Sequence, residues 1–219
     1  MSEFFSFSYA LEILPRLLAA AHLTVELTLV SFSIALAIAL PLALARLSSS
    51  RALSTASGGF IEFIRGTPML IQLFLVFFGL PKLGLPLPPI TAGVLTLSVH
   101  YGCYLAEVYR AGLQAVHPTQ REAAWAVSMS PFETLSIVII PQAIPPMIPA
   151  LGTYLIGLFK DAALLSSISV FELLTTAKLI GTESFRYTEP MTLAGILFLL
   201  MSLAAAAMTR LLERYWIIR

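Results

Sequence analysis

The chain has 219 residues, of which 58% are hydrophobic and only 11% are charged, against about 25% charged residues in ordinary soluble domains. This composition points to a polytopic membrane protein, and the spans described below predict that it is an all-α integral membrane protein. The net charge of +1 argues against a nucleic-acid partner, which requires a concentrated basic face.

The first predicted transmembrane helix covers residues 17–45. No charged residue lies between Glu26 and Arg46, and the adjoining LLAAAHLTV extends the apolar run to the length that crosses a bilayer. Residues 1–15 lack the positively charged region of a signal peptide. A short polar loop is expected after this helix, because Arg46 and Arg51 are followed by serine- and glycine-rich tracts.

The second predicted span, residues 60–80, begins with FIEFIRGTPMLIQL. Gly66, Thr67 and Pro68 are expected to loosen this helix, because proline removes one backbone hydrogen bond and glycine adds freedom. A proline-rich turn covers residues 81–89. The third span, residues 90–113, is uncharged until Glu107 and Arg110 near its end.

Residues 118–143 form a polar-rich island between long apolar runs. Thr119 with Glu122 fits a capping box, and Ser130 with Glu133 fits a second one that has a proline at its first helical position. The pattern therefore predicts two short helices that meet at a bend near residues 128–130. The first helix has a small apolar face that suits a docking partner, and the alternative is an ordinary interfacial loop. That face comprises Ala123, Ala124, Ala126 and Val127.

A cluster of prolines follows the island. Because they cannot all sit inside one regular helix, the second short helix is expected to end near Pro141 and a membrane helix to restart around Met147. The fourth span is then residues 147–171, with Lys160 and Asp161 near its middle. An external loop, residues 172–189, leads to the fifth span, residues 190–212. The prolines are Pro141, Pro145, Pro146 and Pro149.

The distribution of basic residues predicts the orientation. With five spans and the amino terminus outside, the cytoplasmic side collects the larger group of basic residues, as the positive-inside rule requires. The cytoplasmic group is Arg46, Arg51, Arg65, Arg110, Arg121, Arg210, Arg214 and Arg219. The outer group is Arg16, Lys82, Lys178 and Arg186.

Polar groups inside the membrane are the candidates for function, because charges there are costly and usually line a pathway. Lys160 and Asp161 point about 100° apart around a helix, so each needs another partner. A zwitterionic substrate supplies both, with a carboxylate for Lys160 and an ammonium for Asp161. The alternative pairs Lys160 with Glu107 and leaves Asp161 bonded to backbone or water.

Other intramembrane polar residues have two readings each. Gln72 is a candidate wall residue of the substrate path or an amide hydrogen-bonded between helices. Glu107 and Arg110, three positions apart, favour a plain surface pair. Tyr101 and Tyr104 are interpreted as anchors at the membrane interface, with substrate contact as the alternative. The single cysteine, Cys103, excludes an internal disulfide, and the widely separated histidines show no ligand spacing, so we expect no metal site and no cofactor.

The segment REAAWAVSMS…PFETLSIVIIPQA resembles the EAA loop of ABC-importer membrane subunits, whose coupling helices fit into a cleft on the ATPase. Glu122, Ala123 and Ala124 match its first residues, and Pro141 stands at the proline of its Leu-Pro pair. Ser128 stands where the family has glycine, which predicts a less extreme backbone angle here. The resemblance implies that these residues couple the chain to ATP hydrolysis.

Three further segments resemble the polar amino-acid branch of these permeases: the F-R-G-T-P…Q segment, HYGCYLAEVYRAGLQAV and ALGTYLIGLFKDAALLSSISVFELL. In that branch the Lys-Asp pair lies at the substrate cavity. IPQAIPPMIPALG and KLIGTESFRYTEP look most like ectoine and hydroxyectoine permeases. Thr153 departs from a usual asparagine, and Ala162 from a usual threonine. The expected substrate-binding residues are Lys160, Asp161, Gln72, Glu107, Thr67 and Thr153.

The resemblance implies one permease domain over residues 1–219, similar to type I ABC importers and located in a bacterial inner membrane. The chain has no phosphate-binding loop, so a separate ATPase dimer must hydrolyse ATP. The other expected partners are a second permease subunit, an extracytoplasmic solute-binding protein, membrane lipid and a polar amino acid or ectoine-like zwitterion. The alternatives are a membrane enzyme or non-transporting scaffold, and a secondary transporter, which the short length and lack of an inverted repeat disfavour.

Overall fold

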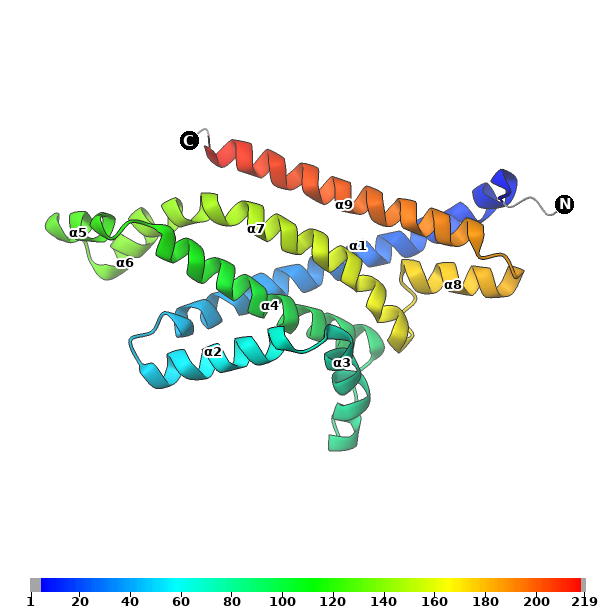
Figure 1. The fold of residues 1–219 in the computed structure, drawn as a ribbon, viewed down its shortest axis with the longest axis horizontal. Helices are drawn as coiled ribbons and strands as arrows, with labels where there is room; N and C mark the ends of the chain where they lie inside the picture. Colours follow the sequence, from blue (N-terminus) through cyan, green and yellow to red (C-terminus); the bar gives the residue numbers. More distant parts are fainter. Residues whose placement is uncertain (1–4, 218–219) are drawn as a thin grey trace.

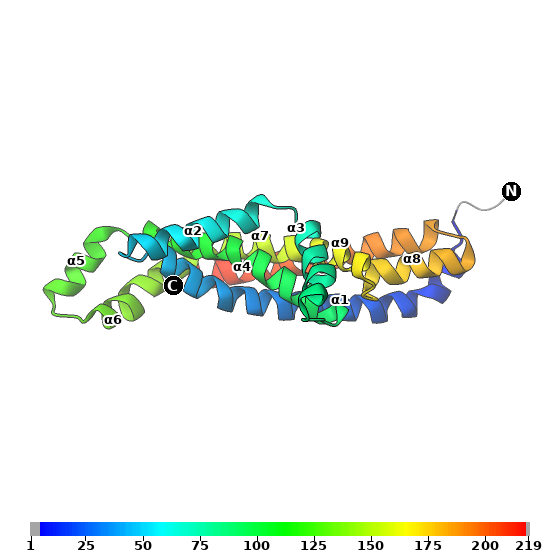
Figure 2. The ribbon, with the colours of Figure 1, turned by 90° about the horizontal axis from the view of Figure 1, so that it is seen from below.

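The computed structural model describes residues 5–217, and every regular element in that range is helical (Figure 1). Four helices run along the long axis, namely α1 (Phe7–Arg46), α4 (Pro89–Ala115), α7 (Ile140–Asp161) and α9 (Thr188–Ile217). The short helices α5 (Pro118–Ala126) and α6 (Pro131–Glu133) lie at one end of this axis, and α8 (Leu173–Ser184) lies at the other (Figure 2). α1 begins near α8, whereas α9 ends on the side of α5 and α6 (Figure 1).

Within residues 5–217, three helices are long and apolar enough to cross a membrane: α1, the continuous helix Pro131–Ile168 that contains α7, and α9. A fourth span results if the bent pair Arg51–Gly66 and Met69–Leu83 counts as one. The predicted third span, α4, is not among them because it carries several polar side chains, including His100, Tyr101 and Tyr104. It is instead the central helix of the core, where α1 packs most extensively against it.

Small residues allow α1 and α4 to approach closely. Ala35, Ala39 and Ala43 on α1 are fully buried. A methyl group on Gly102 of α4 would lie 2.9 Å from Cγ2 of Ile38. Such small-residue interfaces are how membrane helices gain packing contacts, since apolar surface gives no advantage over lipid. The polar helix α4 is thereby shielded along one side by α1.

The second predicted span is broken rather than loosened. α2 (Arg51–Gly66) ends before Thr67, α3 (Met69–Phe74) begins after Pro68, and the two halves meet at 101°. The helix then continues as a π turn (Leu75–Gly79) and a 3-10 turn (Leu80–Leu83). Proline has no N–H and holds its predecessor in the extended region, so a full break follows. The expected polar loop is shorter than predicted: its SSS tract (48–50) lies between α1 and α2, whereas its SGG tract (57–59) is part of α2.

One of the two predicted helix caps forms. The box at Ser130 is confirmed, because Glu133 N donates to Ser130 Oγ (3.3 Å) and Ser130 N donates to Glu133 Oε2 (2.8 Å). The box at Thr119 and Glu122 is wrong. His117 is the N-cap of α5 instead, and its Nδ1 accepts from Thr119 N at 3.3 Å. Pro118, with its fixed φ, starts the helix two positions earlier than the serine/threonine rule suggests.

The bend between the short helices lies where we expected it, but Ser128 adopts a left-handed backbone with φ of 61°. The prediction of a less extreme angle is therefore wrong. Met129 N donates to Ala124 O (3.1 Å) and Ser128 N to Trp125 O (2.9 Å). These two bonds form a Schellman motif, whose geometry requires a left-handed residue whatever its side chain. Ser128 thus adopts the left-handed backbone conformation that is typical of glycine, and its Cβ makes this conformation sterically less favourable.

The prolines do not interrupt α7, which runs from Ile140 to Asp161 with Pro145, Pro146 and Pro149 inside it. The predicted helix end near Pro141 and restart at Met147 are thus wrong. A π turn (Thr134–Ile139) leads directly into Ile140, and its wider turn accommodates the ring of Pro141. Each proline lacks a backbone N–H, so the carbonyl group that would accept from it loses its helical partner. An unpaired carbonyl is tolerated better than an unpaired N–H group. In addition, the side chain of Gln142 donates from Nε2 to Val138 O (2.8 Å).

Other boundaries also differ from the predictions. α1 begins at Phe7 rather than 17, with Ser6 as its N-cap, and α9 extends past the predicted residue 212. The predicted external loop, residues 172–189, contains α8, which Glu172 caps by accepting from Leu174 N (2.8 Å) and Thr175 N (2.7 Å). Burial raises the pKa of the Glu172 carboxyl, while these hydrogen bonds act in the opposite direction. Arg219 of the predicted cytoplasmic group lies outside the described residues.

Candidate functional site

The crossing of α4 and α7 holds the first candidate residue, Asp161. Tyr101 of α4 is only 5% exposed, and its hydroxyl donates to Asp161 Oδ2 at 2.8 Å. Gly157, one turn before Asp161, leaves room for this hydroxyl, because a Cβ there would lie 3.0 Å from it. Asp161 is partly exposed, so one side of its carboxylate is held while solvent or a ligand can reach the other.

Lys160 and Thr153 lie on a neighbouring face of α7. Both are exposed, and their spacing of seven positions places them on the same side of the helix. The hydroxyl of Thr153 donates to Pro149 O at 3.0 Å. Lys160 and Asp161 stand where α7 passes into a 3-10 turn (Ala162–Ile168). Asp161 is thus anchored to α4, whereas the adjacent Lys160 faces outward.

Glu107 is bound by arginines, so the alternative pairing of Lys160 with Glu107 is wrong. Its carboxylate contacts Arg110 at 2.7 Å and Arg46 at 3.9 Å. The predicted pair with Arg110 is confirmed, with Arg46 as a third member from the end of α1. Gly58 of α2 makes space for Arg46, since a Cβ at Gly58 would lie 2.9 Å from the guanidinium carbon. Two cations on one carboxylate leave this cluster with a net positive charge.

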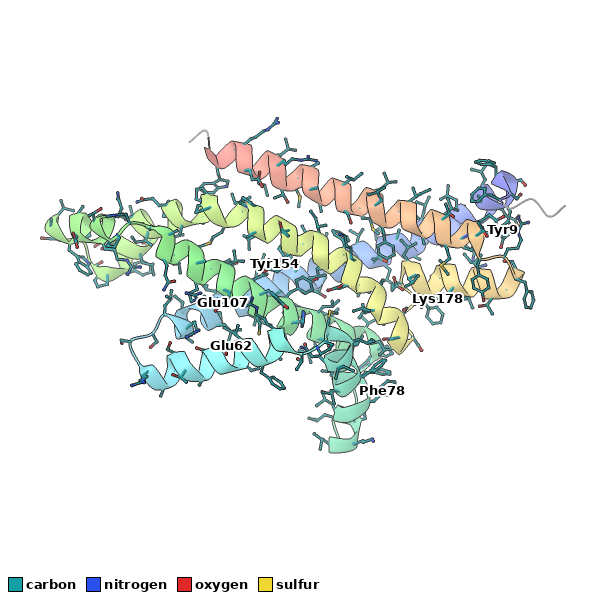
Figure 3. All side chains as sticks on the ribbon, in the orientation of Figure 1. Tyr9, Glu62, Phe78, Glu107, Tyr154 and Lys178 are labelled. Carbon is teal, nitrogen blue, oxygen red and sulfur yellow. The ribbon has the colours of Figure 1, made fainter. Side chains whose placement is uncertain are left out.

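An open groove of about 410 Å³ lies between α4 and α7, and Figure 3 shows Glu107 and Tyr154 on the two helices that flank it. Its volume exceeds that of one amino acid. The rings of Tyr104 and Tyr154 are 5.4 Å apart and close one end, while Glu107 stands in the α4 wall. Apolar side chains of both helices form the rest. The groove therefore combines an aromatic end, an apolar wall and a charged cluster.

Gln72 and Thr67 are in contact with each other at the break between α2 and α3. Gln72 Nε2 lies 2.6 Å from Thr67 Oγ1 and 2.6 Å from Ile64 O, and Gln72 Oε1 lies 3.0 Å from His100 Nδ1. The structure therefore places the six expected substrate-binding residues in three groups. Asp161, Lys160 and Thr153 are on α7, Glu107 is in the arginine cluster, and Gln72 with Thr67 is at the break.

The family of the chain follows from comparison with known proteins. Residues 33–217 match the family model described as "Binding-protein-dependent transport system inner membrane component". The chain belongs to this family. It is a multi-pass permease component of the inner membrane, without a catalytic role of its own, in a transport system that depends on a binding protein.

Two curated relatives of the permease illustrate the similarity. The probable amino-acid ABC transporter permease protein y4tG of Sinorhizobium fredii is 38% identical over 206 residues, which are 94% of this chain and 89% of the relative. The L-cystine transport system permease protein TcyB of Bacillus subtilis is 36% identical over 206 residues, covering 92% of this chain and 88% of the relative.

Solved structures share the fold. A crystal structure of an amino acid ABC transporter with histidines superposes with a TM-score of 0.89 at 35% identity, covering 96% of the permease and 99% of that chain. An inward-facing structure of the MetNI methionine ABC transporter has a TM-score of 0.74 at 19% identity, covering 88% and 92%. At that identity the second likeness shows the fold alone.

The elbow of the permease, residues 118–143, differs in part from the expected flat face. Glu122 and Ala123 are exposed, but Ala124 is only 4% exposed and points inward. The outer surface carries larger apolar side chains instead, with Trp125, Val127 and Phe132 at 59%, 71% and 77% exposure. Ala124 therefore packs the elbow against its own π turn, while bulky residues form the protruding surface.

Sequence reasoning missed the aromatic residues of α4 and α7. Tyr101 and Tyr104, interpreted as interface anchors, lie at the centre of the fold with His100 and Tyr154. Their ring centroids are 5.2 to 6.4 Å apart. The spacing of Tyr101, Tyr104 and His100 already places them on adjoining faces of one helix. That signal was available, but the matching tyrosine on α7 could not be assigned to it without the fold.

Proposed function

We propose that the permease translocates a polar amino acid, or a similar zwitterion, as the membrane subunit of an ATP-driven importer. The printed names of its relatives support this substrate class, since they include an amino-acid, an L-cystine and glutamine permeases. The observation that carries the proposal is the anchored carboxylate of Asp161 at the α4–α7 crossing, with the Lys160 ammonium next to it in the chain. A zwitterion carries the complementary pair of charges.

In this proposal Asp161 binds the substrate ammonium, because one of its oxygens accepts from the Tyr101 hydroxyl and the residue is partly exposed. Lys160 binds the substrate carboxylate, and Thr153 lines the same exposed face of α7. Glu107 acts through its arginine cluster, whose net positive charge attracts a carboxylate. Thr67 and Gln72 border the path at the break in the bent span.

A charged lysine side chain in contact with lipid has a high free-energy cost, so the exposed side of Lys160 is expected to contact another protein subunit. We propose that a second permease subunit, identical or related, covers it and that the path runs between the two subunits. The bundle then has five spans: α1, the bent pair α2–α3, α4, α7 and α9. The amino terminus lies outside and the carboxyl terminus in the cytoplasm, in accord with the opposite ends of the axis at which α1 begins and α9 ends (Figure 1).

The elbow would then face the cytoplasm, where it docks on an ATPase dimer. Trp125, Val127 and Phe132 supply apolar contact area, and the exposed Glu122 adds a charge. Ala124, Ser128 and Pro141 hold the shape of this surface, through packing, the left-handed bend and the start of α7. Ala123 lies exposed beside them. An extracytoplasmic binding protein would deliver the substrate to the opposite end.

Reconstitution of the permease with its ATPase and binding protein in liposomes tests the proposal. Uptake of radiolabelled glutamine, histidine or cystine should require ATP inside the vesicle and the binding protein outside. Ectoine is measured in parallel to decide between an amino acid and a cyclic zwitterion. Uptake driven by an ion gradient without ATP would indicate a secondary transporter. The absence of uptake for every zwitterion, in an assembled complex that hydrolyses ATP, would refute the substrate class.

A further inference from the structure

The break between α2 and α3 exposes the last carbonyl groups of α2, which have no helical N–H to accept from. Inside a membrane such groups must find partners within the protein. Thr67 Oγ1 lies 3.0 Å from Phe63 O and 3.3 Å from Ile64 O. Gln72 Nε2 donates to Ile64 O at 2.6 Å. Side chains from both sides of the break therefore complete the end of α2.

The orientation of the Gln72 amide follows from these contacts. Its nitrogen faces Ile64 O and Thr67 Oγ1, so its oxygen must face His100. Because that oxygen can only accept, His100 Nδ1 must carry the hydrogen of the 3.0 Å bond. His100 is only 7% exposed and belongs to α4. The amide of Gln72 thus joins α2, α3 and α4 at one point.

Tyr104 of α4 provides a second connection to the same end of α2. Its hydroxyl donates to Arg65 O at 3.3 Å, and the Arg65 guanidinium lies 4.9 Å from the centre of its ring. The same tyrosine closes one end of the groove between α4 and α7. The end of α2 is therefore fixed by His100 through Gln72 on one side, and by the groove residue Tyr104 on the other.

We propose that Gln72, held by His100, is a positioning residue that fixes the angle between α2 and α3 and thereby keeps Arg65 seated on Tyr104 at the groove. We refer to Gln72, Thr67 and His100 as the Gln72 clamp. The clamp does not bind substrate, since both amide hydrogens and the amide oxygen of Gln72 are used within the protein. It sets the shape of the bent span on which the groove depends.

The bend can be measured directly. Phe63 on α2 and Leu75 beyond α3 are 65% and 64% exposed, so spin labels on cysteines at these positions report the distance between the two halves. The fully buried Cys103 is replaced by alanine. In the assembled complex, Gln72→Met should broaden or shift the distance distribution, and His100→Phe should change it in the same way. His100→Asn, which retains a donor near the position of Nδ1, should restore it.

Thr96→Val is the matched control, because Thr96 is a buried polar residue of α4 that donates within its own helix, to Ala92 O at 2.8 Å. It should leave the distance unchanged. An unaltered distribution in Gln72→Met, or a failure of His100→Asn to differ from His100→Phe, would overturn the proposal. Should Gln72→Met fail to assemble, the comparison of the two His100 variants decides the question alone.

Uptake supplies a second readout, which rests on the proposed function. Hydrogen bonds between membrane helices are modest, so loss of the clamp should change the apparent KM for substrate by roughly 3- to 20-fold. If no zwitterion is transported, the distance measurement still tests the clamp. A changed distance with wild-type KM would refute the link between the bend and the groove.

Discussion

The Asp161→Asn variant removes one charge while keeping the shape of the site. Asparagine retains an oxygen that can accept from the Tyr101 hydroxyl, now at 2.8 Å from Asp161 Oδ2, so the crossing of α4 and α7 should stay in place. Asp161 is partly exposed, and the loss of its charge leaves no buried cation without a partner in the protein. The variant should therefore assemble as well as the parent permease.

The expected loss concerns the substrate ammonium. A hydrogen bond to a charged group contributes about 1.5–3 kcal/mol, which corresponds to about 10- to 150-fold in affinity. The higher figure applies if the site is dry, and water in the site reduces it. Tyr101→Phe keeps the carboxylate charge but frees its orientation, so its effect on the apparent KM should be smaller. The two variants thus separate charge from positioning.

The assay is initial uptake per assembled complex in liposomes, together with basal and substrate-stimulated ATP hydrolysis. Asp161→Asn should raise the apparent KM and reduce the stimulation, with basal hydrolysis retained. The matched control is Glu12→Gln, which removes an exposed carboxylate of α1. Wild-type uptake per complex in Asp161→Asn would remove Asp161 from the site. Poor assembly with normal uptake in the surviving complex would assign it a structural role.

Four further outcomes are expected. Ala124→Asp places a charge in a site that is 4% exposed and should abolish uptake while the chain still inserts; normal uptake by a well-expressed variant would contradict the docking role. Ser128→Gly should stabilise the elbow by about 1 kcal/mol, seen as roughly fivefold slower amide exchange over residues 118–130. Gly157→Ala should displace the Tyr101 hydroxyl, now 3.0 Å from the added Cβ, and raise the apparent KM more than the same change at Gly195, where nothing lies within 4 Å. A reporter active only in the cytoplasm should work at the carboxyl terminus and fail at the amino terminus, and activity at both ends would require an even number of spans.

Local signals predicted much of the helical framework. Low charge content indicated an all-helical membrane protein, and the box at Ser130 was correct because a cap depends on residues within one turn. The predictions failed where the local backbone conformation depends on several residues together. The rule against proline inside a helix treats each proline alone, whereas the π turn before Ile140 accommodates Pro141. The resemblance located Ser128 at a bend, but the required backbone angle comes from the Schellman bonds rather than from the side chain.

The candidate site was harder to predict because its contacts join distant segments. Nothing near Tyr101 in the sequence indicates that its hydroxyl meets Asp161, which is 60 positions away. Gln72 had two readings, and the structure supports the amide bonded between helices. Charge pattern alone identified Glu107 with Arg110, since the pair lies on one helix face, but Arg46 enters from another helix. The sequence therefore indicated which residues carry functional groups, but not which residues they contact in the fold.

The polarity of α4 has a consequence for how the permease is made. A helix that falls short of the apolar composition of its neighbours is retained poorly in lipid by itself. α1 precedes it in the chain and offers the alanine-lined surface against which it packs. Because α1 precedes α4 in the chain, we expect it to enter the bilayer first during synthesis. It would then offer α4 a surface to pack against as α4 inserts.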